Sequence, residues 1–161
     1  MVAIKIEDVK EFTSRLFLKD SFDGFLLKEA QIVTFGSVSI DGRLRRGFFL
    51  PQELERLGQE AYAPWSLWRP HCFELIRGKR LPESFRVVLQ LPQDQAERFC
   101  LELGEKEQDA PGLYLNIRYE DGTLYCVTGI SLKVFTLDKT LEQEWDRRAE
   151  EMMRQMKIAH M

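Results

Sequence analysis

The sequence predicts an α+β fold in which helices cover one face of an antiparallel sheet. The segment Leu113 to Thr136 holds two runs of alternating apolar and polar residues joined by Asp121-Gly122, the strongest short-range signal for a β-hairpin. A second alternating segment contains another such pair, Asp41-Gly42. Segments with apolar residues every three or four positions flank both, and this spacing is typical of amphipathic helices.

Size and composition indicate one domain over residues 1–161. The chain is 44% hydrophobic and 30% charged, which is ordinary for a globular protein, and its net charge of −3 gives no general argument for nucleic acid or an anionic membrane. No apolar run approaches the ~18 residues of a membrane span, and the first residues lack a signal-peptide core. Cys72, Cys100 and Cys126 are widely spaced, so we expect buried free thiols and a cytoplasmic location.

The hairpin at Asp121-Gly122 can be assigned a register. A two-residue loop pairs Glu120 with Thr123, and further along the strands Ile117 with Cys126. This register places the apolar side chains on one face, which we expect to be dry: Leu113, Leu115, Ile117, Tyr119, Leu124, Cys126, Ile130, Leu132 and Val134. A slip of one residue would mix the two faces, so the turn and the apolar pattern support the same register.

The segment around Asp41-Gly42 predicts a second hairpin, with strands over residues 31–40 and 43–49. A three-residue loop with Gly42 in the left-handed conformation pairs Val38 with Leu44. It also places Ile32, Ile40 and Phe48 on the same side. We therefore expect a bulged hairpin here.

The first half of the chain also predicts three helices. Glu7 to Leu18 has apolar residues on one side and acidic residues at its start. Pro51 to Gly58 has proline in the first turn and glycine at the end. Arg69 to Gly78 has Pro70 to begin a helix and Gly78 to end it, although a strand is the alternative for this piece.

In the second half, Phe85 to Leu91 alternates and predicts one further strand, and Pro92 begins a helix that extends to about Leu103. The last helix is expected from Asp138 to about Lys157, followed by a loose tail over residues 158–161. Apolar residues recur along this helix in one stripe: Leu141, Trp145, Ala149, Met152 and Met156. The favoured interpretation is that the stripe packs on the sheet. The alternative is an oligomer or partner surface formed by Leu141, Trp145, Met152 and Met156, since methionine adapts to varied shapes.

No catalytic or cofactor motif is present in the sequence. There is neither a glycine-rich phosphate loop nor a Gly-x-Ser-x-Gly elbow, and we predict no cofactor and no metal, because His71 and His160 are the only histidines. His71 beside Cys72 suggests a thiol enzyme, but sequence neighbours do not face each other on a helix or a strand. We therefore name no catalytic residue.

A concentration of aromatic and cationic residues between Trp65 and Arg86 is the best candidate for a binding site. Guanidinium groups interleaved with aromatic rings suit phosphate contacts and base stacking. The candidate ligand-binding residues are Trp68, Arg69, His71, Arg77, Lys79, Arg80 and Arg86, and Arg43, Arg45 and Arg46 could approach them in space. The alternative is that the tryptophans fill the core and the cations lie along a solvated edge.

Two stretches resemble a small uncharacterised bacterial family, a domain of unknown function. They are residues 65–82, from Trp65-Ser-Leu-Trp-Arg-Pro-His-Cys, and Leu115-Asn-Ile-Arg-Tyr-Glu-Asp-Gly122 with residues 128–139. The resemblance extends over nearly the whole chain. It implies a bacterial, cytosolic, single-domain protein and no particular activity.

The function expected from these observations is a non-catalytic binding module for an anionic ligand, either a nucleotide or nucleic acid. Two alternatives stay open: a small enzyme with a pocket around His71, and a subunit that docks through its last helix. A deep cleft containing His71 would favour the enzyme.

Overall fold

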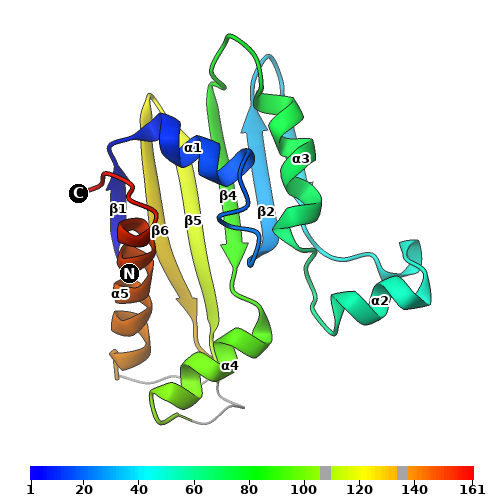
Figure 1. Cartoon of the computed structure of the whole chain (residues 1–161), viewed down its shortest axis with the longest axis vertical. Helices are drawn as coiled ribbons and strands as arrows, with labels where there is room; N and C mark the ends of the chain where they lie inside the picture. The colour runs from blue at the N-terminus through cyan, green and yellow to red at the C-terminus, as the bar shows by residue number, and fades with distance from the viewer. Residues whose placement is uncertain (106–109, 134–137) are drawn as a thin grey trace.

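The computed structural model describes residues 1–105, 110–133 and 138–161 and contains a single six-stranded sheet (Figure 1). The strand order is β1-β6-β5-β4-β2-β3, and every neighbouring pair is antiparallel. The strands are β1 (Ala3–Ile6), β2 (Leu26–Val33), β3 (Ser37–Asp41), β4 (Ser84–Gln90), β5 (Gly112–Glu120) and β6 (Thr123–Ser131). The helices are α1 (Val9–Phe17), α2 (Pro51–Leu57), α3 (Trp65–Ile76), α4 (Gln93–Glu102) and α5 (Thr140–Gln155), with a 3₁₀ turn η1 (Arg46–Phe48).

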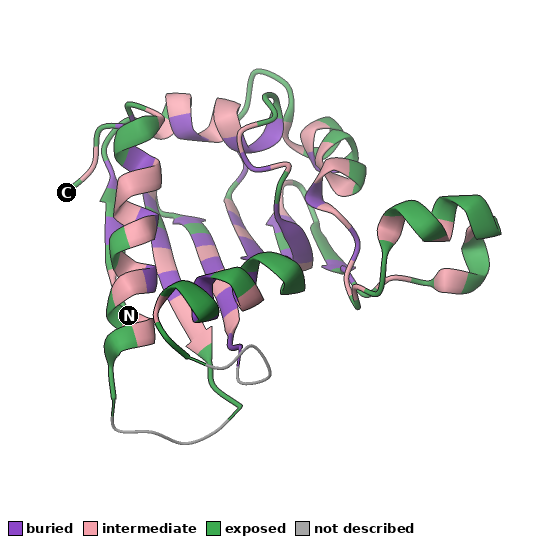
Figure 2. Ribbon diagram, turned by 60° about the horizontal axis from the view of Figure 1, so that its bottom comes forward, coloured by how far each residue is buried: buried purple, intermediate pink, exposed green. Residues whose placement is uncertain are grey.

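Helices α1, α3, α4 and α5 lie on the same face of the sheet (Figure 1). The core lies between this face and the helices, where Figure 2 shows the buried residues in purple. Its largest fully buried side chains include Trp65, Phe12, Phe17, Phe22 and Phe99. The predicted α+β architecture, an antiparallel sheet covered on one face by helices, is therefore confirmed.

The β5–β6 hairpin has the predicted register. Glu120 pairs with Thr123 and Ile117 pairs with Cys126 across a two-residue turn. Asp121 and Gly122 both have positive φ, 52° and 74°, as this type of tight turn requires. The predicted dry face is buried from Leu113 to Tyr119 and from Leu124 to Cys126; Ile130 is half-buried, Leu132 is exposed, and Val134 lies outside the described residues.

The prediction for the second hairpin is wrong. The strands are β2 and β3, and they turn at residues 34–36, so that Val38 pairs with Ile32 and not with Leu44. Residues 43–49 form no strand, and Phe48 is 86% exposed. The turn occurs at Gly36, which the sequence pattern treated as part of a strand.

Gly42 has a different role from the predicted left-handed turn. Its N–H donates to the carbonyl oxygen of Lys28 at 3.0 Å, beside a bulge between Leu27 and Glu29. A Cβ atom at this position would lie 1.8 Å from the carbonyl oxygen of Leu27. Glycine therefore allows the end of β3 to approach the β2 backbone closely.

The predicted helices are confirmed, with shifts at their ends. Asp8 caps α1 by accepting a hydrogen bond from the backbone N–H of Glu11. Helix α3 begins at Trp65, four residues earlier than predicted, because Pro64 and not Pro70 precedes its first turn. Pro70 lies inside α3, so the strand alternative for this segment is excluded.

Both ends of the chain are ordered on one edge of the sheet. The strand β1, which the sequence pattern does not predict, pairs with β6. The expectation of a loose tail is wrong, because Ile158 is buried and the backbone N–H of Met161 donates to the carbonyl oxygen of Lys5 at 2.9 Å. The tail covers the outer side of β1, where Ile6 forms a bridge with His160.

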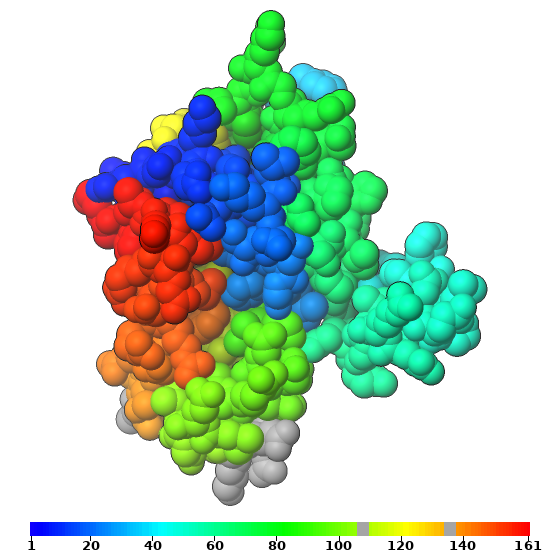
Figure 3. Space-filling model, in the orientation of Figure 1, coloured from blue at the N-terminus to red at the C-terminus, as the bar shows by residue number. Residues whose placement is uncertain are grey.

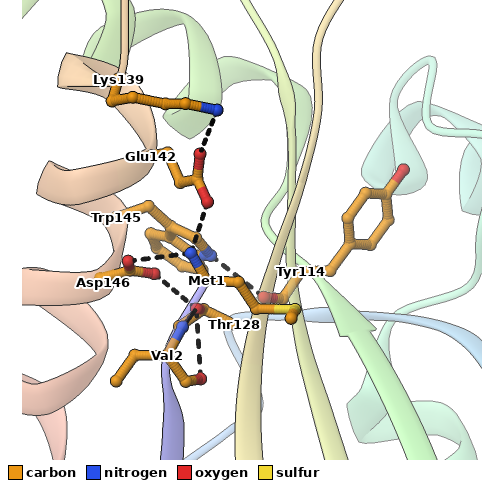
Figure 4. Close-up of polar contacts among 8 residues, drawn as sticks. All are labelled: Met1, Val2, Tyr114, Thr128, Lys139, Glu142, Trp145 and Asp146. Atoms are coloured by element: carbon orange, nitrogen blue, oxygen red, sulfur yellow. Dashed lines mark hydrogen bonds and ion pairs between the residues drawn. The ribbon is translucent and has the colours of Figure 1, made fainter.

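Helix α5 packs on β5 and β6 through its apolar stripe and through polar contacts (Figure 4). Trp145 is buried and donates its indole N–H to the carbonyl oxygen of Tyr114 at 3.0 Å. Thr128 donates its hydroxyl to Oδ1 of Asp146, and the amino group of Met1 contacts Oδ2 of the same carboxylate. The favoured interpretation of the stripe, packing on the sheet, is thus confirmed for Trp145.

Residues 43–62 form an arm that protrudes from the rest of the molecule (Figure 3). Neither η1 nor α2 contains a buried residue. The guanidinium group of Arg46 closes the arm by donating to the carbonyl oxygens of Gly58 and Glu60 at 2.8 and 2.9 Å. Within the described ranges, no helix has the length and apolar character needed to cross a membrane.

Candidate functional site

The cations of the candidate binding segment do not converge on one point. Arg69 forms a bidentate ion pair with Asp23, with Nε–Oδ1 and Nη2–Oδ2 distances of 2.8 and 2.9 Å. The hydrogen bond to this carboxylate raises the pKa of Arg69. Since Arg69 also donates to the carbonyl oxygen of Leu18 at 3.2 Å, it holds the loop after α1 against α3.

The other cations of the segment occupy separate places on the surface. Arg77 is exposed and pairs with Glu74 within α3. Arg86 pairs with Glu29 at 3.2 Å on the face of the sheet opposite to the helices, because its neighbours Phe85 and Val87 point into the core. Lys79 and Arg80 are exposed in the loop between α3 and β4.

Trp68 and His71 lie together at a groove of about 410 Å³ between α3 and the start of the arm. Their rings form an edge contact with centroids 6.0 Å apart. The groove is lined by Arg43, Leu44, Arg45, Phe48, Phe49, Ala63, Leu67, Trp68 and His71, and we call it the aromatic groove. Of the candidate residues, Trp68 and His71 therefore line one cavity, whereas Arg69, Arg77, Lys79, Arg80 and Arg86 do not.

Backbone hydrogen bonds hold the two walls of the aromatic groove in place. The N–H of Leu44 donates to the carbonyl oxygen of Ala61, and the N–H of Ala63 donates to that of Gly42, at 2.9 and 2.8 Å. On the other wall, Trp65 at the start of α3 is fully buried and donates its indole N–H to the carbonyl oxygen of Leu16. The side chain of Trp68, one turn later, is thereby fixed over the groove.

The chemistry of the aromatic groove is apolar and cationic. Arg43, Arg45 and His71 are its polar lining side chains, and none of its lining residues is acidic. The carboxylate of Asp41 lies beside the groove: Oδ1 accepts the backbone N–H of Arg43 at 3.0 Å, and Oδ2 pairs with Arg45 at 3.6 Å, where both side chains are more than half exposed. An exposed pair of this kind contributes little, so Arg45 can exchange Asp41 for another anion at low cost.

Phe48 is the groove residue that the sequence pattern misplaced. It was expected on a strand, yet it is 86% exposed and its ring meets that of Phe49 edge-on at 5.4 Å. The expected approach of cations from residues 43–46 is correct for Arg43 and Arg45. Arg46 instead holds the arm closed.

The environment of Cys72 argues against a thiol nucleophile. Its side chain is fully buried, and burial raises the pKa of Cys72 to about 12. The thiol therefore stays protonated near neutral pH and is a poor nucleophile. His71 is exposed whereas Cys72 is buried, and neighbouring residues of a helix do not face each other, so the two side chains do not form a catalytic pair.

Cys72, Cys100 and Cys126 are all buried and form no disulfide, as predicted. No group of three or more His, Cys, Asp or Glu side chains with the geometry to hold a metal ion occurs in residues 1–105, 110–133 and 138–161.

Comparison with known proteins identifies the family of the chain. A family model described as "Family of unknown function (DUF5721)" matches residues 15–161. No curated protein and no solved structure matches the chain.

Proposed function

The chain belongs to the DUF5721 family of unknown function, and from the aromatic groove itself we propose that it is a non-catalytic binding module for a nucleotide. The observation that carries this proposal is the combination of aromatic walls, Trp68 and Phe48, with two arginines at a groove that no carboxylate lines. The aromatic rings would stack on the base, and the arginines would contact the phosphate.

The exposed aromatic rings support a stacked ligand. Phe48 leaves most of its surface in water, and a planar base that covers it would recover part of that apolar area. Stacking of a base on an aromatic side chain contributes about 1–3 kcal/mol. Any base has a flat face, so this contact favours aromatic ligands as a class without selecting one base.

The charges support an anionic ligand. Arg43 and Arg45 present planar guanidinium groups that suit phosphate oxygens, and His71 can add a hydrogen bond. The net charge of −3 works against a long nucleic acid, whose binding depends on many phosphate contacts. A mononucleotide, or the end of a short single strand, therefore fits the groove better than a duplex.

Fluorescence titration with mononucleotides at two salt concentrations tests the proposal. Trp65 and Trp145 are buried and remote from solvent, so a ligand that stacks in the groove should change mainly the emission of Trp68. The change should be saturable, weaker at high salt, and absent in Trp68→Phe.

Matched variants make this test specific. The double variant Arg43→Ala/Arg45→Ala should lose at least tenfold in affinity, and Phe48→Ala should lose about 1–3 kcal/mol. Arg98→Ala on α4, which also removes an exposed cation with an acidic neighbour, should bind as the wild type does. If all these variants bound a mononucleotide with the affinity of the wild type, the proposal would be wrong.

A bacterial, cytoplasmic setting is part of the same proposal. The cytoplasmic location is supported by three buried cysteines that form no disulfide, which is typical of a reducing compartment. Mass spectrometry of the protein from its native cells, after rapid thiol alkylation, should find all three cysteines reduced.

A further inference from the structure

The two edges of the sheet differ in how they are covered. On the outer side of β1, the chain's own tail supplies backbone contacts: Met161 donates to Lys5, and Glu7 donates to the carbonyl oxygen of Ala159 at 2.8 Å. At the other edge lies β3, and no described strand pairs with its outer side. An uncovered edge strand presents backbone groups that another strand can pair with.

The direction of the backbone groups of β3 follows from its contacts with β2. The N–H of Gly42 donates to Lys28, and that of Thr34 donates to Gly36 at 2.9 Å, so the even-numbered positions of this hairpin face inward. Because these directions alternate along an antiparallel strand, the N–H and C=O groups of Ser37, Ser39 and Asp41 point away from β2.

The sequence of β3 carries few of the usual devices that block an edge, and its only charged residue is Asp41 at the end of the strand. Residues 37–41 read Ser-Val-Ser-Ile-Asp, without lysine, arginine or proline, and the strand has no bulge on its own side. Val38 is 38% exposed, and Phe35 at the tip of the hairpin is fully exposed. Apolar surface is therefore available along this edge.

We propose that β3 pairs with β3 of a second copy of the chain, antiparallel and centred on Ser39, so that two six-stranded sheets join across a twofold axis. In this register Ser39 faces its own twin and Ser37 faces Asp41 of the second copy. Each of these pairs joins two residues whose backbone groups point outward, so every pair exchanges two hydrogen bonds.

The side chains of β3 fit this arrangement. On the helix-covered side, Val38 lies opposite Ile40 of the second copy, which brings two apolar residues together. On the other side, Ser37 lies opposite Asp41, so that no two like charges face each other. The strand is thus complementary to itself, and for this reason a second copy is favoured over an unrelated peptide.

Cysteine cross-linking tests the register. In a hydrogen-bonded antiparallel pair the two Cα atoms lie about 5.5 Å apart, and a disulfide requires roughly 4.4–6.8 Å. Ser39→Cys should therefore form a covalent dimer on mild oxidation. Ser37→Cys is the matched control, because its twin would lie four residues along the strand, roughly 13 Å away.

The native thiols do not interfere, since all three are buried. We expect Ser39→Cys to cross-link at least tenfold faster than Ser37→Cys. Equal rates, or no dimer from either variant, would overturn the proposal.

Sedimentation provides a second, independent measurement. The wild type at high micromolar concentration should sediment as a dimer. Ser39→Pro should sediment as a folded monomer, because it removes an N–H that points away from β2. A wild type that is monomeric at this concentration, or a Ser39→Pro variant that is folded and dimeric, would show that β3 does not form the interface.

Discussion

The hydroxyl group of Thr128 donates a hydrogen bond to Oδ1 of Asp146 at 2.5 Å and so ties the buried centre of β6 to helix α5 (Figure 4). Thr128 is only 1% exposed. The same hydroxyl oxygen accepts the backbone N–H of Val2, the residue before β1, at 2.8 Å, so one side chain connects the start of the chain, β6 and α5.

Replacing Thr128 by valine keeps the shape and removes this connection. We expect Thr128→Val to lower the free energy of unfolding by about 1–3 kcal/mol. The reason is that Oδ1 of Asp146 and the backbone N–H of Val2 each lose a hydrogen bond to the buried hydroxyl group. Urea denaturation monitored by circular dichroism measures this loss in the free energy of unfolding. Thr13→Val on the half-buried side of α1 is the control, and an equal loss in both variants would contradict the role of the Thr128 hydroxyl.

Gly42→Ala should destabilise the fold strongly. The added Cβ would lie 1.8 Å from the carbonyl oxygen of Leu27 and 2.9 Å from that of Lys28, and both are backbone atoms that cannot move independently of β2. We expect a loss of more than about 3 kcal/mol, or no folded protein. The control is Gly36→Ala, where nothing lies within 4 Å and φ is not positive; its stability should change by less than about 0.5 kcal/mol.

Alkaline pH should destabilise the protein through its buried thiols. Burial raises the pKa of both Cys72 and Cys126 to about 12 from 9.0. Because the unfolded chain loses these protons first, the stabilisation is complete below pH 9 and is lost as the pH rises towards 12. Each thiol contributes a slope of about −1.4 kcal/mol per pH unit in this window.

Urea denaturation between pH 9 and 11 gives this slope directly. The double variant Cys72→Ala/Cys126→Ala keeps the other titrating groups, so its free energy of unfolding should fall less steeply with pH than that of the wild type. If the free energy of unfolding fell equally steeply with pH in both proteins, the buried thiols of Cys72 and Cys126 would not be the cause.

Arg69→Ala should affect stability and not ligand binding. Its bidentate pair with Asp23 is about one fifth exposed, so we expect a loss of about 1–2 kcal/mol in the free energy of unfolding. In the folded fraction, the affinity for a mononucleotide should stay within twofold of the wild type. A tenfold loss of affinity with unchanged stability would place Arg69 at the ligand.

The two Asp-Gly pairs show where sequence reasoning succeeds and where it fails. At Asp121-Gly122 the turn signal and the apolar alternation require the same register, and the structure has that register. At Asp41-Gly42 the same dipeptide ends a strand, because Gly42 is needed for a close approach to the distant residue Leu27. A contact of this kind leaves no periodic signal in the sequence.

The candidate site was predictable only where its residues are close together in the sequence. Trp68 and His71 are three residues apart on one helix, so a local pattern brings them together. The contribution of Phe48 depends on an arm whose backbone is held by Ala61 and Ala63, and no short-range pattern reveals it. The role of Arg69 depends on Asp23, which lies 46 positions earlier.

The pairing of β1 with β6 has a consequence for how the chain acquires its structure during synthesis. Ala3 can meet Val127 only after most of the polypeptide has left the ribosome, whereas β2 and β3 need a few consecutive residues. Closing so long a loop is slow compared with forming a local hairpin. Of the strands of this sheet, β1 is therefore synthesised before the others and joins last, and Ile4 and Ile6 stay exposed to wrong contacts until β6 is available.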